Sequence, residues 1–220
     1  MKEIMLTKVI GSPTELSFGL EKIGLKPVIE SFIDIAFTKW APPLPRMNWI
    51  FFSSANAVRG TLQNQSDLSA YKIACIGRGT AAALPAEYSI DFIGESADTS
   101  KVATKFAEIA QNETVVFPIS SISNRTIQKQ LKESQVHEIV VYQTLLKPRK
   151  VDSRPFLVFS SPSQWDGFKM SNKTDENQKI FAFGKTTEAA IRAAGTKVDG
   201  ILKDISVNGL ISTIKEHVRS

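Results

Sequence analysis

An internal repeat constrains this chain more than any other feature of its sequence. The segment Phe52-Ser-Ser-Ala-Asn56 resembles Phe159-Ser-Ser-Pro-Ser163, and Ile76-Gly-Arg-Gly-Thr80 resembles Phe183-Gly-Lys-Thr-Thr187. The offset along the chain from the first motif to its copy is the same in both pairs. A constant offset over two separate motifs indicates that one structural unit occurs twice in the chain.

Short apolar runs alternate with segments of helical period along the whole sequence. This alternation is typical of parallel sheets whose strands are connected by crossover helices, so the sequence predicts an α/β fold. The predicted strands are Glu3–Leu6, Lys26–Ser31, Trp49–Ser53, Tyr71–Ile76, Thr114–Phe117, Glu138–Gln143, Phe156–Ser160 and Lys179–Phe183.

A fainter match, at a slightly larger offset, extends the repeat. It aligns segment 16–28 with segment 127–139, each of which is predicted to be a helix followed by a strand. The chain therefore reads as two kinds of unit in the order A, B, A′, B′. The main repeat also aligns Thr99 with Ser206, and each is predicted to cap the helix that follows it.

Two proline-rich segments, 39–45 and 147–155, predict where the chain crosses between domains. Proline lacks a backbone donor and interrupts helices and central strands, so such segments suit connections. Residues 1–37 and 151–220 would then form one discontinuous domain and residues 40–147 an inserted one, with connectors at 38–40 and 147–151. The residues alone equally permit two tandem halves.

Composition restricts the environment and the partners. Among 220 residues there is no apolar run of the roughly 18 residues that span a bilayer, and the chain begins without a signal peptide, so we expect a cytoplasmic protein that has no membrane contact. The net charge of +5 favours an anionic partner, but the basic residues are too scattered for nucleic acid. The single cysteine, Cys75, lies in an apolar run and is predicted to be buried.

Several familiar kinds of site are disfavoured. Ala82 stands where a dinucleotide-binding loop would have its third glycine, and the chain has no P-loop and no G-x-S-x-G motif. His137 and His217 have no companion at metal-ligand spacing, so we expect no metal site. A flavodoxin-like flavin-binding module is a further alternative, but the sequence lacks the phosphate loop of such a module. A colourless preparation of the protein would exclude a bound flavin.

Each repeat contains a strand that ends in two serines and a second strand that ends in a glycine. In parallel sheets, ligands collect beyond the carboxyl ends of the strands, where helix N-termini offer unpaired N–H groups. Helix capping is the simpler role for each serine or threonine taken alone. The predicted substrate-binding residues at these edges are Ser54, Asn56, Gly77, Thr80, Ser121, Arg125, Ser161, Ser163, Gly184, Thr186 and Thr187.

The sequence permits two roles for each of two candidate side chains, Tyr142 and Arg125. Tyr142 ends a predicted strand, and its hydroxyl either faces a ligand or sits in water above a packed ring, with neither interpretation favoured. Arg125 follows another strand and either binds a carboxylate in a bidentate manner or lies on a solvated face, which is the favoured interpretation.

Taken in order, these motifs resemble the uroporphyrinogen-III synthase family. Their order and spacing, which span nearly the whole chain, carry the resemblance more than any single motif does. The segments concerned are Phe52–Val58, Ile76–Leu84, Glu95–Asp98, Val140–Thr144, Phe159–Ser163 and Phe183–Thr187.

The resemblance implies two HemD-like (flavodoxin-like) domains joined by a two-stranded linker. It implies a cyclising lyase, free of metal and organic cofactor, that converts hydroxymethylbilane into uroporphyrinogen III and water with inversion of ring D. Tyr142 would then hydrogen-bond the leaving hydroxyl, and the edge residues would line the substrate site. It also implies a monomer that contacts porphobilinogen deaminase transiently.

A competing hypothesis is a two-domain binding or sensor protein that closes on an anionic small molecule without catalysis. Its geometry would be nearly the same. Product formation separates the two hypotheses, because a sensor would bind its ligand without turnover.

Overall fold

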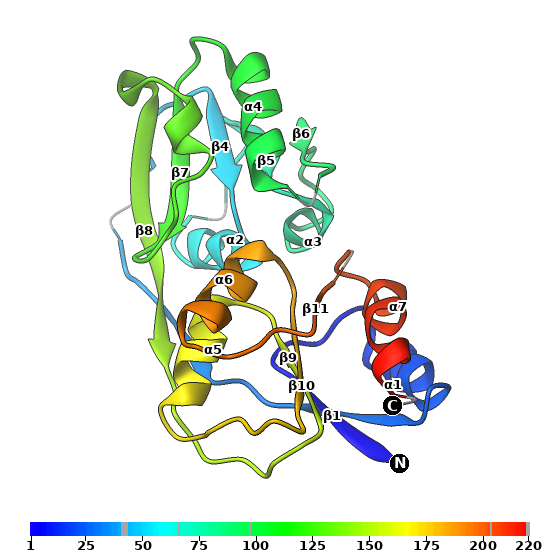
Figure 1. The fold of residues 1–220 in the computed structure, drawn as a ribbon. Coiled ribbons are helices and arrows are strands. Elements are labelled where there is room, and N and C mark those ends of the chain that lie inside the picture. Colours follow the sequence, from blue (N-terminus) through cyan, green and yellow to red (C-terminus); the bar gives the residue numbers. More distant parts are fainter. Residues whose placement is uncertain (41–43, 66, 97, 203, 219–220) are drawn as a thin grey trace. The chain divides into compact units, whose positions relative to one another are not determined.

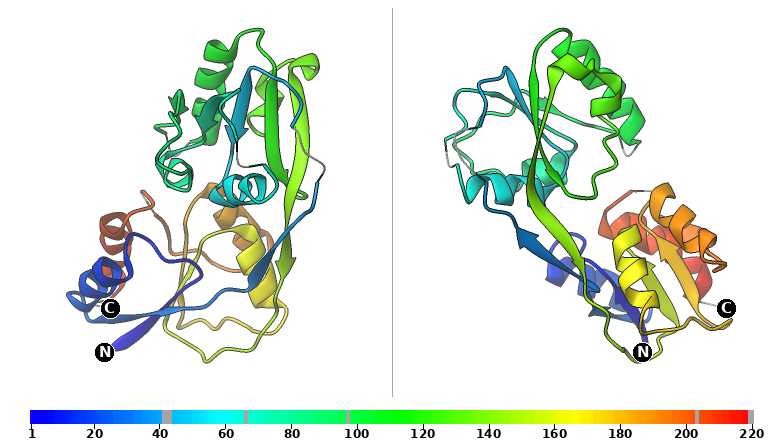
Figure 2. Two further views of the ribbon diagram at one scale, coloured as in Figure 1. Left: turned by 180° about the vertical axis from the view of Figure 1, so that it is seen from behind. Right: turned by 90° about the vertical axis from the view of Figure 1, so that its left-hand side faces the viewer.

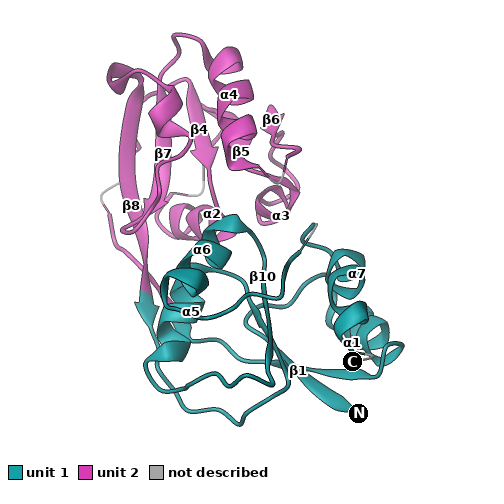
Figure 3. Cartoon of the chain, viewed as in Figure 1, with its two compact units in different colours: residues 1–34, 145–220 teal, residues 35–144 magenta. Residues whose placement is uncertain are grey.

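The computed structural model of the chain describes residues 1–40, 44–65, 67–96, 98–202 and 204–218. It divides into two compact units (Figure 3). Residues 1–34 together with 145–220 form unit 1, and residues 35–144 form unit 2.

The chain passes between the units within two strands, β3 (Ile33–Phe37) and β8 (Val136–Leu146). These strands are neighbours in one sheet, so the connection is a two-stranded linker. The crossings lie a few residues before the proline-rich segments 39–45 and 147–155, and residues 41–43 of the first segment are outside the described part of the chain.

Unit 1 contains a five-stranded parallel sheet in the order β11-β10-β9-β1-β2. Side chains alternate between its faces, because Ile4 and Leu6 pack against α1 and α7 whereas Met5 packs against α5 and α6. Figure 1 shows these helix pairs side by side. The elements are β1 (Lys2–Leu6), α1 (Pro13–Glu21), β2 (Leu25–Ile29), β9 (Phe156–Phe159), α5 (Pro162–Lys169), β10 (Lys179–Ala182), α6 (Lys185–Ala193), β11 (Gly200–Ile201) and α7 (Val207–Val218).

Unit 2 contains a six-stranded sheet in the order β3-β8-β7-β4-β5-β6. Phe51 faces α4, whereas Ile50 and Phe52 face α2 and α3, and Figure 2 shows α2 and α4 on opposite sides of the sheet. The further elements are β4 (Trp49–Phe52), α2 (Ala55–Leu62), β5 (Lys72–Cys75), α3 (Arg78–Ala81), β6 (Phe92–Ile93), α4 (Thr99–Ala110), β7 (Val115–Ser120) and the 3₁₀ turns η1 (Gln128–Gln130) and η2 (Glu133–Gln135).

The two sheets share one strand order. Reading unit 2 from its β6 edge, β6-β5-β4-β7-β8 corresponds to β11-β10-β9-β1-β2 of unit 1, and β3 is added at the end. All eight predicted strands are present, and the predicted α/β class with helices flanking parallel sheets is confirmed. No helix within the described residues is long and apolar enough to cross a membrane.

Two local predictions are wrong. Segment 127–131 contains only the 3₁₀ turn η1, since two apolar residues supply one turn, which is too little to nucleate a helix. Thr99 does not cap α4, because the carboxylate of Asp98 takes that position and accepts the amide of Ser100 at 3.0 Å. The predicted cap at Ser206 is confirmed by its bond to the amide of Gly209.

A glycine in α2 and another in α5 bring each helix onto the backbone of the chain that links the units. A Cβ at Gly60 would lie 2.6 Å from the carbonyl oxygen of Val141 in β8, and one at Gly167 would lie 2.2 Å from that of Phe32, just before β3. Gly60 and Gly167 are separated by the offset of the main sequence repeat. The repeat therefore includes the packing of a helix against a linking segment.

Candidate functional site

The carboxyl edge of the sheet in unit 2 gathers four of the predicted residues. Strands β4, β5, β7 and β8 run parallel, so their carboxyl ends lie at one edge. Ser54 follows β4, Gly77 follows β5, Ser121 follows β7 and Tyr142 lies in β8. The amide of Ser121 donates to the carbonyl of Tyr142 at 3.2 Å, which joins the last two strands at this edge.

Tyr142 and Ser54 form the direct side-chain contact of this edge. Their hydroxyl oxygens are 3.0 Å apart, and Ser54 Oγ also accepts the amide of Ala57 at 3.1 Å as the N-cap of α2. The tyrosine is 9% exposed, and its ring packs in the apolar cluster beneath α2. When Ser54 donates to Tyr142 Oη, the hydrogen of the tyrosine stays available for a third group.

A β-bulge turns Tyr142 towards Ser54. In the pairing of β7 with β8, Ile119 is opposite Val140 but Ser120 is opposite Tyr142, so Val141 is an extra residue. Regular alternation would place Val141 and Tyr142 on opposite faces, yet both belong to the cluster beneath α2. Bulges re-aim side chains in this way, and no local pattern in the sequence indicates this one.

The carboxyl edge of unit 1 repeats the same caps. Ser161 caps α5 and accepts the amide of Gln164 at 3.3 Å. Its φ and ψ of −158° and 161° match the −161° and 155° of Ser54. Gly184 caps α6 with φ −167° and ψ 174°, close to the 178° and 174° of Gly77 at α3. The repeat seen in the sequence is thus preserved in backbone conformation.

Thr80 and Thr187 are not helix caps, contrary to the simpler interpretation of the sequence. A glycine occupies the N-cap position of each helix, so the threonine lies in the first turn instead. Both threonines are buried. Neither Gly77 nor Gly184 supplies a side-chain acceptor to the first-turn amides. The N-terminus of the nine-residue α6 therefore presents backbone donors and a positive dipole end without a capping side chain.

The remaining candidates lie around these caps. Asn56 accepts the guanidinium of Arg59 at 3.2 Å along its own helix, so its side-chain oxygen is engaged within α2. Ser163 is half-buried in the first turn of α5, and Thr186 is exposed in the first turn of α6. These side chains flank the helix N-termini from which a bound anion would receive backbone hydrogen bonds.

Arg125 is drawn into an ion pair within unit 2. Its Nε lies 3.0 and 2.9 Å from the two carboxylate oxygens of Glu138, and Nη1 donates to the carbonyl of Ser123. Glu138 is in register with Phe117, three residues before the end of β7. The guanidinium is therefore paired with a group set back from the edge at which Ser54 and Tyr142 meet.

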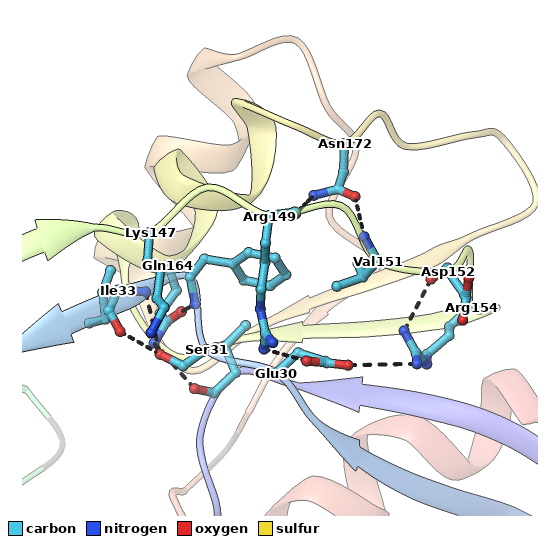
Figure 4. A network of polar contacts seen from close by, with 12 residues as sticks. Glu30, Ser31, Ile33, Lys147, Arg149, Val151, Asp152, Arg154, Gln164 and Asn172 are labelled. Atoms are coloured by element: carbon cyan, nitrogen blue, oxygen red, sulfur yellow. Dashed lines mark hydrogen bonds and ion pairs between the residues drawn. The ribbon is translucent and has the colours of Figure 1, made fainter.

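Three edge residues of unit 1 were missed by the sequence analysis: Thr7, Ser31 and Gln164. The buried amide of Gln164 accepts the amide N–H of Phe32 at 2.7 Å and donates to Ser31 Oγ at 3.1 Å (Figure 4). It also donates to the carbonyl of Thr7 at 3.3 Å. The spacing Ser161-x-x-Gln164, which resembles a capping box, was the available signal.

Neither the single cysteine nor a cluster of metal-binding side chains contributes to this site in the described residues. Burial raises the pKa of the Cys75 thiol to about 12, so it stays protonated as a core side chain, as predicted. Within the described residues, no group of three or more His, Cys, Asp and Glu side chains is placed to hold a metal ion.

Comparison with known proteins gives one family and one fold. Residues 14–212 match the family model described as uroporphyrinogen-III synthase HemD. The structure is similar to a uroporphyrinogen-III synthetase from Helicobacter pylori 26695, with 16% identity, a TM-score of 0.71 and coverage of 99% of this chain and 100% of that one.

A mutant uroporphyrinogen III synthase from the extremely thermophilic bacterium Thermus thermophilus is also similar, with 15% identity, a TM-score of 0.57 and coverage of 100% of this chain and 99% of that one. At these identities the structural likeness shows a common fold. No curated protein matches the sequence significantly.

Proposed function

The chain belongs to the uroporphyrinogen-III synthase family, and on that basis we propose that Tyr142 takes part in the reaction while the carboxyl edges of the two sheets bind the substrate. Members of this family are cyclising lyases of tetrapyrrole biosynthesis. Its substrate is hydroxymethylbilane, and its products are uroporphyrinogen III, in which ring D is inverted, and water. The hydrogen bond between Tyr142 and Ser54 is the observation that carries the proposal.

The pyrroles of the substrate supply the reacting carbon atoms, so the protein forms no covalent bond to the substrate in this scheme. The pyrrole that bears the terminal hydroxymethyl group expels its hydroxyl, and the exocyclic carbon of the resulting azafulvene is attacked by the substituted carbon of ring D. The spiro intermediate then fragments and recombines to close the inverted ring. Negative charge develops on the departing oxygen, which leaves as water once it is protonated, so a positioned hydroxyl donor lowers the barrier of the first step.

Tyr142 is suited to be that donor. Its hydroxyl is held by Ser54, and Ser54 in turn is held by the first turn of α2. We propose that Ser54 is the donor in this bond, so that the tyrosine directs its own hydrogen to the leaving oxygen. The mostly buried ring limits the number of orientations that the hydroxyl samples.

The negative charge of the substrate's eight carboxylates is complementary to the positive dipole ends of the helix N-termini at the two edges. Such a contact contributes about 0.3–1 kcal/mol when exposed and more when water is excluded, so many of them together hold a polycarboxylate without a cluster of basic side chains. Gly77 and Gly184 leave the first-turn amides of α3 and α6 without a capping side chain. The other proposed contacts are Ser54, Asn56, Thr80, Ser121, Arg125, Ser161, Ser163, Thr186 and Thr187.

The test generates hydroxymethylbilane in situ with porphobilinogen deaminase, adds the chain, oxidises the products and separates the uroporphyrin isomers by chromatography. We expect type III uroporphyrin in place of the type I isomer that spontaneous closure gives. An unchanged type I pattern from folded protein would overturn the proposal and favour a binding protein without turnover.

We also propose that the chain works as a monomer in the cytoplasm and contacts the deaminase only transiently. The substrate closes spontaneously to the wrong isomer, so a short path from the deaminase limits the loss. Sedimentation of the chain with and without deaminase would reveal either a stable complex or an oligomer, and each would contradict this arrangement.

A further inference from the structure

Gln164 is a buried amide whose hydrogen-bonding groups are all turned towards the ends of strands in unit 1. It is 5% exposed and stands at the third residue of α5, immediately beneath the cap at Ser161. Both of its N–H groups donate, to Ser31 Oγ and to the carbonyl of Thr7, and its oxygen accepts the amide of Phe32 (Figure 4). One side chain thus ties α5 to the residues that follow β1 and β2.

Thr7 carries this connection on to β9. Its hydroxyl donates to Ser160 Oγ at 3.0 Å and accepts the amide of Ser160 at 2.8 Å. Thr7 is 3% exposed, whereas Ser31, Ser160 and Ser161 are half-buried. A buried layer, made of Thr7 and Gln164, therefore lies under a row of accessible hydroxyls at the edge where substrate is proposed to bind.

The segment beside Ser31 is fixed as well. Glu30 pairs with Arg149 and lies 3.7 Å from Arg154, whose guanidinium also contacts Glu3 at 3.1 Å (Figure 4). Arg154 is 8% exposed and the side chain of Glu30 is 17% exposed, so their contact is shielded from water, whereas Arg149 and Glu3 lie at the exposed ends of the network. The backbone that carries Ser31 is consequently held from both sides.

We propose that Gln164 is a positioning residue for substrate binding, which orients Ser31 directly and Ser160 through Thr7 so that their hydroxyls receive substrate carboxylates. The hydroxyl of Ser31 donates to the carbonyl of Ile33 at 2.9 Å, and on binding the substrate carboxylate takes the place of this acceptor. The equivalent place in unit 2 supports this role. The main offset of the sequence repeat aligns Gln164 with Ala57, and the slightly larger offset aligns Ser31 with Tyr142. At this place in unit 2 the large side chain is Tyr142, from strand β8. In unit 1 it is Gln164, from helix α5.

The substitution Gln164→Met keeps the volume and removes the hydrogen bonds. Gln178→Met is a matched control, because Gln178 is a second buried glutamine of unit 1 with the same bonding pattern. It donates to the carbonyl of Arg154 and to Ser153 Oγ and accepts the amide of Asp175, at the start of β10 and away from the carboxyl edge. Both variants should lower the melting temperature by similar amounts.

Steady-state kinetics with hydroxymethylbilane distinguish positioning from stability. In Gln164→Met we expect KM to rise about tenfold with kcat within about twofold of wild type, since a misplacement of about 1 Å costs up to about a hundredfold. Gln178→Met should keep the wild-type KM. Ser31→Ala should raise KM as well, and adding it to Gln164→Met should have little further effect, because both act on one contact.

An unchanged KM in folded Gln164→Met, or an equal rise in Gln178→Met, would overturn the inference. If Gln164→Met does not fold, Ser31→Ala decides, because it leaves the bonds of Gln164 to Thr7 and Phe32 intact, and an unchanged KM there is equally contrary. The inference rests on the proposed function. A wild-type chain that makes no type III product would overturn that function, whereas type III product with unaltered KM values would overturn this inference alone.

Discussion

The carboxyl edges of the two sheets share the backbone conformation of their helix caps but take their large side chains from different elements. In unit 2 the helix offers Ala57, and the strand offers Tyr142, whose hydroxyl meets Ser54. In unit 1, Ser31 lies two residues beyond the end of β2, and α5 contributes Gln164, whose polar atoms hydrogen-bond to the protein itself. We infer that duplication preserved the caps, while exchanges of a large for a small residue at these two places put the proposed chemistry at the edge of unit 2, with substrate bound at both edges.

The largest expected effect tests the tyrosine. Tyr142→Phe removes the hydroxyl and keeps the ring, so kcat should fall by about 10² to 10⁴, the usual contribution of a positioned proton donor, with KM and folding nearly unchanged. Rates of type III formation and the melting temperature check this together. A variant with wild-type kcat would show that unit 2 carries no such donor and would remove the contrast between the edges.

The second effect tests the packing that the two units share. Gly60→Ala and Gly167→Ala each place a methyl group against a backbone oxygen, so each should reduce the free energy of unfolding by about 1–3 kcal/mol. Gly79→Ala is the control for stability, because a Cβ there meets nothing within 4 Å. Urea denaturation would measure the three variants, and equal stability of all of them would contradict the close approach.

Gly60→Ala should in addition lower kcat, because the carbonyl that it presses on belongs to Val141, the bulged residue before Tyr142. Gly167→Ala should instead raise KM, since it presses on Phe32 next to Ser31. The same kinetic change in both variants would argue against separate roles for the two edges.

The smallest effect concerns a repeated aspartate at the opposite ends of the strands. Asp199 accepts the amide of Ile180 at 2.9 Å, and Asp91 accepts that of Ile73 at 2.8 Å. Burial raises the pKa of Asp199, but the bond from Ile180 and the charges of Lys197 and Lys179 outweigh it and leave the pKa below its ordinary value. The carboxylate therefore contributes stability above the unfolded pKa of about 3.9, and this is lost as the pH falls further.

Asp199→Asn keeps an oxygen for the Ile180 amide and removes the charge. Wild type should be more stable at pH 7 by about 1 kcal/mol, the usual size of such a contribution, and this difference should shrink as the pH is lowered towards about 3. Thermal unfolding across that range checks it. Parallel losses in both proteins would contradict the assigned role of the charge.

Local pattern was enough to predict most of the strands and several of the caps. Eight of the eleven strands in the described residues and the caps at Ser54, Ser161 and Ser206 follow from short-range periodicity and from the preference of serine for helix starts. The strands β3, β6 and β11 were not predicted. The interpretation of Tyr142 stayed balanced because its orientation depends on the bulge in β8. That bulge arises from the pairing with β7, which a single segment does not encode.

Long-range pairing also explains the other misses. Gln164 and Ser31 are separated by 133 positions, and the capping-box spacing of Gln164 with Ser161 does not indicate a contact with Ser31. Arg125 takes a φ of 54°, a conformation that is rare outside glycine, and pairs with Glu138 from the next strand. Such contacts follow from the assembled sheet and not from the motif that surrounds each residue.

The sharpest test compares Ser54→Ala with Ser161→Ala, because the two serines cap their helices in the same conformation. Each variant should lose about 1 kcal/mol of stability with its cap. We expect Ser54→Ala to lower kcat for type III formation, since Tyr142 loses its partner, and Ser161→Ala chiefly to raise KM. The same change of kcat and KM in both variants would contradict the assignment of the chemistry to the edge of unit 2.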